Sequence, residues 1–411
     1  MKLKQSGPAR KMDAFGENKE EYEMNLRVDV ENRMGDYGNE ITIEADGTAE
    51  EVLKVANGIV EKAIRAGLGE ETMDDGRRLQ PVTEKEVKPI PGFEDAESDV
   101  VAIYDNAGIP SFMYRIRRVS NKELFGGSEK IHPAFIIGGV VYDEIFIAVF
   151  EGTMINGKIY SLPYTKPVTN ITQDEFAEAC FSKGEGWHMI TAAEWGLLSN
   201  FCLKNGTLPH GNTNYGKYHA DHSETCECFD GGKALTGSGP ATWTHNHKPD
   251  GIHDLCGNIW EMCRGLRMKD GRLEAAMNND AALPETDLST DGADWHPVVT
   301  DDGKAIYIDA SDGIVITDDE DEVEGGYDGE KWKDVQVKVE SEQLKELALF
   351  AGEPDAYCYV DSSEGEWCLF RGGRWGRGGA AGVFYSYLYD PRSLVNTAFG
   401  GRSAFFKKKA N

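Results

Sequence analysis

The sequence contains no apolar run that approaches the length of a membrane span, and its start, MKLKQSGPARKMDAFGENKEE, lacks the apolar core of a secretory signal. We therefore expect neither membrane insertion nor a Sec signal peptide. Basic residues are also scarce, because 43 Lys and Arg stand against 71 Asp and Glu in 411 residues, a formal net charge of -28. A surface of this charge repels nucleic acid and anionic membranes, so neither is an expected partner.

A disulfide framework is not expected either, because the chain shows no export signal. The eight cysteines lie at positions 180, 202, 226, 228, 256, 263, 358 and 368. Cys180 and Cys202 fall on the apolar faces of predicted helices, where a buried free thiol is the simplest interpretation.

One stretch near the C-terminus lacks several residue types altogether. Residues 371–402, RGGRWGRGGAAGVFYSYLYDPRSLVNTAFGGR, contain no Lys, Glu, Gln or Met, although 28% of the whole chain is charged. What the stretch does contain is a glycine-rich framework, several aromatic residues, five arginines and one aspartate. This omission requires a cause, and the interpretation of the rest of the chain depends on this stretch.

The N-terminal part is predicted to form a small ββα-like domain over residues 1–68. Alternation of apolar and polar residues predicts strands from Glu21 and over 40–45, and a capping box at Thr48 (TAEE) begins a helix that stops near Gly67. This domain could serve attachment or oligomerisation, or be a plain folded appendage. Residues 69–97 carry three prolines and many charges, which is typical of a linker.

Residues 98–411 are predicted to form one irregular α+β domain with long loops. Capping boxes at Thr172 (TQDE) and Thr191 (TAAE) each precede a helical apolar face. Strands are predicted over 100–104, 112–118 and 135–150, an acidic insertion over about 283–340, and a last helix over 341–350.

Three motifs in this domain resemble one family. Residues 186–195 (GWHMITAAEW), 254–262 (DLCGNIWEM) and 371–373 (RGG) are similar to the W-R-L-P-T-E-A-E-W, D-M-x-G-N-V-W-E-W and R-G-G motifs of formylglycine-generating enzymes, also called sulfatase-modifying factors. The resemblance spans about 98–406 and implies an elaborated C-type-lectin fold. From the residues alone, Asn258, Trp260 and Glu261 are interpreted as structural, because an asparagine can satisfy backbone groups and a tryptophan can fill core.

The segment after the R-G-G looks like the variable region of diversity-generating retroelement target proteins, which use the same lectin fold. The framework G-G-x-W-x-x-G-x-x-A-G-V-F, a later R-S and a final G-x-R are matched, among others, by Gly373, Trp375, Phe384 and Arg402. Gly401 departs from the family, which more often has Phe there, so the packing of the final turn is open.

The resemblance also supplies a cause for the missing residue types. Such retroelements mutate adenines, chiefly in AAY codons, and these codons cannot become Lys, Glu, Gln, Met or Trp. The predicted ligand-binding positions are Arg374, Gly376, Arg377, Ala380, Tyr385, Tyr387, Tyr389, Asp390, Leu394, Asn396 and Ala398. Trp375 is not reachable by this route, and it occupies a framework position.

Physical chemistry supports a recognition surface at these positions independently. Tyr385, Tyr387 and Tyr389 alternate, so on a strand they project to one face. Tyrosine offers a large contact area at low entropic cost, and arginine adds forked hydrogen bonding and stacking on rings. The alternative is that the tyrosines pack inward on the lectin core.

A metal centre is not expected, although alternatives stay open. The family's copper-binding cysteines would fall at about Arg377 and Gly382, and thiolate chemistry cannot be run by other side chains there. His219, His222, Cys226 and Cys228 have zinc-ligand types at close spacing, but in a predicted surface loop. The acidic run 318–324 lacks the glycine placement of an EF-hand, so it indicates weak calcium binding or solubility.

We therefore expect a non-enzymatic, diversified ligand-binding protein with no required cofactor. The resemblance implies a phage receptor-binding tail tip or a bacterial display protein that binds a host or bacterial surface protein or glycan. A virion or cytoplasmic location is expected, and a homo-oligomer stays open, as a trimer at a virion tip. The alternatives are a formylglycine-generating-type metal oxidase and a carbohydrate-binding module without diversification.

Overall fold

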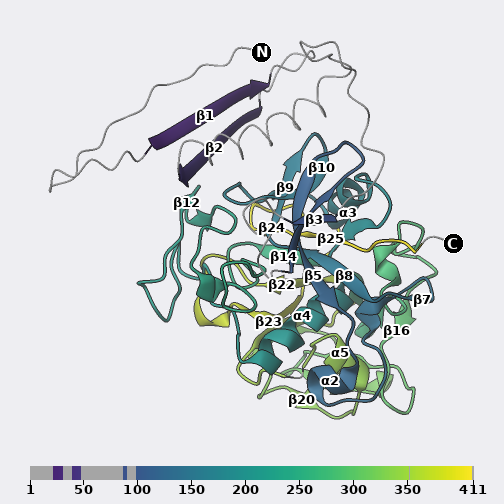
Figure 1. The fold of residues 1–411 in the computed structure, drawn as a ribbon. Coiled ribbons are helices and arrows are strands. Elements are labelled where there is room, and N and C mark those ends of the chain that lie inside the picture. The colour runs from purple at the N-terminus through teal and green to yellow at the C-terminus, as the bar shows by residue number, and fades with distance from the viewer. Residues whose placement is uncertain (1–21, 31–38, 48–86, 90–98, 351, 410–411) are drawn as a thin grey trace. The chain divides into compact units, whose positions relative to one another are not determined.

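A computed structural model describes residues 22–30, 39–47, 87–89, 99–350 and 352–409 (Figure 1). The chain divides into two compact units, one of residues 1–85 with 104–109 and one of residues 86–103 with 110–411. Over the described residues the second unit is mixed α+β, with far more sheet than helix, which confirms the predicted class.

The first unit contains the two strands that alternation predicted. β1 (Tyr22–Val30) pairs antiparallel with β2 (Asn39–Gly47), with Tyr22 opposite Gly47 and Val30 opposite Asn39. The helix predicted after Thr48 lies outside the described residues. So does most of the predicted linker, but three of its residues form β3 (Val87–Pro89), which pairs antiparallel with β4 (Val100–Tyr104).

A six-stranded sheet joins the beginning of the second unit to its end. Its order is β11 (Trp187–Met189), β25 (Ser403–Phe405), β8 (Glu144–Ala148), β5 (Pro110–Arg117), β4 and β3. The run predicted as one strand over 135–150 is broken, because Gly138 and Gly139 have φ of +58° and +72°. These glycines turn β6 (Ile136–Ile137) back onto β7 (Val140–Val141) before β8 begins.

The larger sheet has eleven strands and carries the C-terminal segment. Its main order is β19 (Tyr327–Lys331), β21 (Tyr357–Asp361), β23 (Gly382–Leu388), β22 (Glu366–Gly372), β14 (Trp260–Lys269), β15 (Arg272–Ala275), β17 (Tyr307–Asp309), β18 (Val315–Thr317) and β20 (Gln336–Val337). β16 (His296–Pro297) pairs with β15, and β24 (Phe399–Gly400) pairs parallel with β14. Two further hairpins are β9 (Gly152–Ile155) with β10 (Lys158–Ser161) and β12 (Cys228–Phe229) with β13 (Lys233–Ala234).

The helices begin where their capping residues predict. α3 (Gln173–Phe181) and α4 (Ala192–Asn205) have capping boxes from Thr172 and Thr191, so both predictions are confirmed. α5 (Glu342–Glu346) begins after Ser341 but ends earlier than predicted, because Ala348 and Phe350 adopt φ of +48° and +50°. The other described helices are α2 (Asn121–Phe125) and the 3-10 turns η1 (Pro133–Phe135), η2 (Ala241–Trp243), η3 (Asp280–Ala282), η4 (Glu320–Glu322) and η5 (Gly378–Ala380).

The acidic segment 283–340 extends the larger sheet through β16 to β20. Its buried residues Ile308, Ile316 and Trp332 belong to the same hydrophobic cluster as Trp195 and Leu198 of α4. Trp195 also donates from Nε1 to the carbonyl oxygen of Val383 at 2.8 Å, which ties α4 to β23. No helix among the described residues is both long and apolar enough to cross a bilayer.

Candidate ligand-binding face

The two ends of the segment 371–402 are anchored by buried arginines. Arg402 is fully buried. Its Nε donates to Oε2 of Glu261 at 2.7 Å, and its NH2 donates to the carbonyl oxygen of His253 at 2.9 Å. Arg371 is also fully buried and donates to the carbonyl oxygen of Leu347 at 2.6 Å and to Oγ of Ser386 at 2.7 Å. Burial lowers the pKa of Arg371 to about 10. These two side chains therefore fix the framework.

Few of the five arginines in this segment are consequently available at the surface. A third arginine, Arg392, donates from NH2 to Oδ1 of Asp174 at 2.6 Å, at the start of α3. Only Arg374 and Arg377, of the five arginines in the segment, remain near the surface without a carboxylate partner among the described contacts. The other three have partners inside the fold: Arg371 bonds Ser386 and the Leu347 carbonyl, Arg392 bonds Asp174, and Arg402 bonds Glu261.

The glycine-rich loop after β22 is held by two other loops. The N–H of Trp375 donates to the carbonyl oxygen of Asn258 at 2.9 Å, and the N–H of Gly378 donates to that of Thr213, also at 2.9 Å. The N–H of Tyr215 in turn donates to the carbonyl oxygen of Trp375 at 2.7 Å. A Cβ on Gly376 would lie 2.9 Å from the Tyr215 hydroxyl, so a larger residue at this position would have to displace the Tyr215 ring.

Asn258 itself has the structural role that was expected for it. It is fully buried, its Nδ2 donates to Oε2 of Glu151 at 2.6 Å, and its Oδ1 accepts from the N–H of Ala234 at 2.7 Å. Its φ of +55° places its own carbonyl toward Trp375. The motif around Asn258 thus connects the glycine-rich loop to β13.

The alternating tyrosines share one face, but they are not equally accessible. Tyr385 and Tyr387 lie two apart on β23, and Tyr389 follows directly after it. Tyr385 is fully buried, because the rings of Trp260 and Tyr357 lie 4.7 Å and 5.5 Å from its own ring. Its prediction as a ligand-contacting residue is therefore wrong for the described structure, and it is part of the core.

Ala398 is the second correction. It is only 7% exposed and packs in the same hydrophobic cluster as Trp260 and Phe399. The Ala398 side chain faces inward because its backbone carbonyl accepts from the N–H of Trp260 at 2.8 Å, which draws the chain onto β14.

Tyr387 is half-buried and lies at the centre of the accessible rings. Its hydroxyl donates to Oδ2 of Asp390 at 2.7 Å, and its ring is stacked on Tyr359 at 5.8 Å with an interplanar angle of 15°. Burial raises the pKa of Asp390, against the lowering effect of the Tyr387 hydrogen bond. Tyr387 and Asp390 therefore form one hydrogen-bonded unit that faces the surface.

Four aromatic residues near this unit were not predicted, because they lie outside 371–402. They are Tyr327 on β19, Tyr357 and Tyr359 on β21, and Trp367 on β22. Parallel pairing of β21 with β23 sets Tyr359 opposite Tyr387, and Trp367 is stacked on Tyr389 at 6.3 Å. The signal in the sequence was the alternation YCYV at 357–360, which is typical of a half-buried strand.

We call this surface the aromatic face and define it by Tyr327, Tyr357, Tyr359, Trp367, Arg377, Tyr387, Tyr389 and Asp390. Gly329 makes room for it, since a Cβ there would lie 2.4 Å from Cδ2 of Tyr359. Arg377 donates from NH2 to the hydroxyl of Tyr385 at 3.1 Å, and its buried Nε has no hydrogen-bond partner in the described structure. The face thus combines ring surfaces with a guanidinium that makes one described hydrogen bond.

The remaining predicted positions differ in how close they lie to the aromatic face. Ala380 and Leu394 pack on the same hydrophobic cluster as Tyr357, Tyr359 and Tyr387, so the structure brings them together. The guanidinium of Arg374 lies 5.5 Å from the ring of Trp375, beside Gly376 in the glycine-rich loop. Asn396 is exposed, and its Oδ1 accepts from the N–H of Ala398 at 2.9 Å.

The suggested zinc ligands are not assembled around a common point. Nδ1 of His219 lies 2.9 Å from Oγ1 of Thr213, and Nε2 of His222 lies 3.1 Å from Nδ2 of Asn214. Only the Cys226 and Cys228 sulfurs approach each other, at 3.6 Å. Within the part of the chain that the structure describes, no three His, Cys, Asp or Glu side chains are grouped as a metal site would require.

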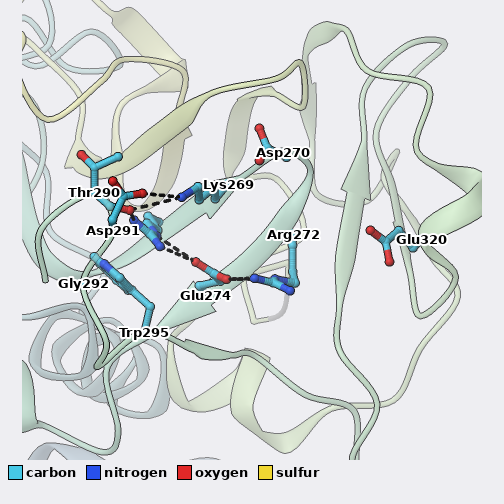
Figure 2. A pocket seen from close by; sticks show the side chains of 10 residues that line it. Lys269, Asp270, Arg272, Glu274, Thr290, Asp291, Gly292, Trp295 and Glu320 are labelled. Carbon is cyan, nitrogen blue, oxygen red and sulfur yellow. Dashed lines mark hydrogen bonds and ion pairs between the residues drawn. The ribbon is translucent and has the colours of Figure 1, made fainter.

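A polar cleft of about 390 Å³ lies elsewhere on the larger sheet, on β14 and β15 (Figure 2). Glu274 is buried in it between two arginines and accepts from Nε of Arg267 at 2.8 Å and from Nε of Arg272 at 2.9 Å. Lys269 reaches Thr290 and Asp291 across the cleft (Figure 2). None of the positions predicted to bind a ligand lines this cleft.

No protein-family model matches the chain, and no curated protein matches it.

Proposed function

We propose that the chain is a ligand-binding recognition protein that uses the aromatic face. The observation that carries the proposal is the contact between the half-buried rings of Tyr359, Tyr387 and Tyr389 on one face. Arg377 lies beside them and has no ion-pair partner among the described residues. Rigid tyrosines and an arginine with free donors are the side chains that dominate protein-recognition hot spots. Tyr327 is 63% exposed at the rim and adds a ring that a partner can cover.

The finer proposal is a diversity-generating retroelement target protein built on a C-type-lectin-type scaffold. In this view the accessible positions Arg374, Gly376, Arg377, Ala380, Tyr387, Tyr389, Asp390, Leu394 and Asn396 vary. Trp375 and the buried Arg371 and Arg402 stay constant. The absence of Lys, Glu, Gln and Met from 371–402 supports this proposal. The natural partner is then a protein or glycan on a bacterial surface, bound by a phage tail tip or by a display protein.

The neighbouring DNA tests the diversification directly. The proposal requires a near-identical repeat of the coding sequence for 371–402 that differs at adenines, beside a reverse transcriptase gene. Without such a repeat, diversification is excluded, while recognition by the aromatic face is still open to test.

Binding is tested with the full chain on a panel of bacterial cells and on a glycan array. We expect at least one cell type or glycan to retain the wild-type protein and to lose the Tyr389→Ala variant. Arg272→Ala, in the polar cleft, is the matched control and should bind like the wild type. Equal binding by all three proteins would contradict the use of the aromatic face.

A further inference from the structure

The pair Cys226 and Cys228 differs from the other cysteines of the chain. Their sulfurs lie 3.6 Å apart, and Cys228 is exposed while Cys226 is partly exposed. The other six cysteines are all buried. Side chains two apart on an extended chain point to the same side, and Cys228 begins β12, so the two sulfurs face each other.

The surroundings hold both cysteines against Gly216. The N–H of Cys226 donates to the carbonyl oxygen of Gly216 at 3.1 Å. A Cβ on Gly216 would lie 2.3 Å from Sγ of Cys228, so this sulfur rests directly on the Gly216 backbone. The imidazoles of His219 and His222 have other partners, and among the residues that the structure describes no group of three metal ligands includes the two thiols.

We propose that Cys226 and Cys228 form a redox-active dithiol that closes to an intrachain disulfide in exchange with a small-molecule disulfide. The exposed Cys228 thiolate attacks one sulfur of that disulfide and releases its first thiolate. Cys226 then attacks the mixed disulfide at Cys228 and releases the second thiolate. The protein loses two hydrogens and the oxidant is reduced to two thiols, so atoms and electrons balance.

The order of attack follows from the environment of each sulfur. Burial raises the pKa of the Cys226 thiol, and the nearby Cys228 sulfur raises it further. The mixed disulfide removes the charge on Cys228, so that second effect disappears when Cys226 has to react. The sulfurs must approach from 3.6 Å to about 2.05 Å, and so short a ring is expected to be strained and easily reduced.

The dithiol is connected to the glycine-rich loop through two neighbouring residues. Gly216 follows Tyr215, whose N–H donates to the carbonyl oxygen of Trp375 at 2.7 Å. Movement of the two sulfurs therefore displaces a segment that holds residues 374–378. Any effect on ligand affinity rests on the proposed function, whereas the thiol chemistry and the movement do not.

The chemistry is tested on the reduced full chain with glutathione disulfide. We expect two of the eight thiols to be lost, a mass lower by two hydrogens, and a peptide that links Cys226 to Cys228. Cys226→Ser should keep a stable glutathione adduct at Cys228, and Cys228→Ser should react far more slowly. Cys256→Ser is the matched control and should close normally. A persistent adduct on the wild type, or disulfide-linked dimers, or stoichiometric zinc that protects both thiols, would overturn the proposal.

The connection to the loop is tested by hydrogen exchange of the reduced and oxidised chain, without any ligand. We expect altered exchange in peptides that cover 212–219 and 373–379, and unchanged exchange in β14. Identical exchange in both states would refute the connection while leaving the proposed recognition function untouched. If all ligand-binding assays failed, the hydrogen-exchange difference between the reduced and oxidised chain would still be valid.

Discussion

The aromatic face and the polar cleft lie on the same eleven-stranded sheet, and each sets an arginine against aromatic rings. In the cleft, the guanidinium of Arg267 lies 4.3 Å from the ring of Trp295. Its nitrogens donate to Glu274 at 2.8 Å, to Glu366 at 2.7 Å and to the carbonyl oxygen of Thr290 at 2.8 Å. Every nitrogen of this guanidinium therefore has a partner within the protein.

Arg377 on the aromatic face has far fewer hydrogen-bond partners than Arg267. Its guanidinium lies 5.8 Å from the ring of Tyr385 and 5.9 Å from that of Trp260, with one described hydrogen bond, to the Tyr385 hydroxyl. A ligand in the cleft would have to break ion pairs, whereas Arg377 has no ion pair among the described residues that a ligand on the aromatic face would have to break.

The largest effect on stability is expected at Tyr385, which is buried next to the aromatic face. Tyr385→Ala should lower the free energy of unfolding by about 4 kcal/mol, because a fully buried ring leaves a cavity beside Trp260. Chemical denaturation measures the change. Tyr385→Phe keeps the ring and should cost only about 1 kcal/mol for the lost hydrogen bond from Arg377. Similar, small losses for both variants would mean that Tyr385 belongs to the accessible surface after all.

In the cleft, the next largest effect is expected at Glu274. Glu274→Gln removes the charge that faces two arginines, and Arg267 is only 3% exposed, so we expect a loss of about 3 kcal/mol in the free energy of unfolding. Asp291→Asn, whose side chain is 94% exposed, should leave the stability nearly unchanged. Ligand binding by Glu274→Gln should match the wild type at temperatures where both are folded. A binding defect there would place the cleft in the recognition site.

These two sites also show what the sequence could predict. Local signals succeeded: Thr172 and Thr191 with a Glu three residues later mark the starts of α3 and α4, because a capping box involves only one turn. Alternation located β1 and put the tyrosines of β23 on one face, and strand-like runs located β4 and β5.

What the sequence could not predict depends on partners far along the chain. Tyr385 is covered by Trp260 and Tyr357, and Arg402 is paired with Glu261, none of which is adjacent in sequence. Whether a tyrosine or arginine is core or surface is decided by such contacts. The aromatic face could be predicted only in its C-terminal half for the same reason, since β21 joins β23 through pairing that no local pattern encodes.

A smaller effect is expected at Arg377, where a substitution should change ligand affinity but not stability. Arg377→Met should weaken binding to the partner found on cells or arrays by about thirtyfold, the equivalent of about 2 kcal/mol, because the unused donors are lost. Its melting temperature should change little, since the described structure gives Arg377 a single hydrogen bond. Arg272→Met in the cleft is the matched control and should bind normally. If Arg272→Met lost binding and Arg377→Met bound normally, the ligand would bind in the cleft and not on the aromatic face.

The smallest effect concerns the pH dependence of the unit of Tyr387 and Asp390. Because burial raises the pKa of Asp390, the folded state holds its proton more tightly than the unfolded state does. The contribution of Asp390 to the free energy of unfolding therefore falls as the pH rises from the pKa of the unfolded state, about 3.9, to the higher pKa of the folded state. Above the folded-state pKa this contribution is constant. Denaturation of the wild type and of Asp390→Asn across this range gives the difference in unfolding free energy at each pH.

We expect the wild type to lose unfolding free energy relative to Asp390→Asn as the pH rises, because only the wild type has to bury a charge beside Tyr387. Asp291→Asn, which removes an exposed carboxylate in the cleft, should show no such trend. If the wild type instead gained stability over Asp390→Asn with rising pH, the Tyr387 hydrogen bond would outweigh burial. The aromatic face would then satisfy its own polar groups as the cleft does, and the contrast between the two regions would rest on Arg377 alone.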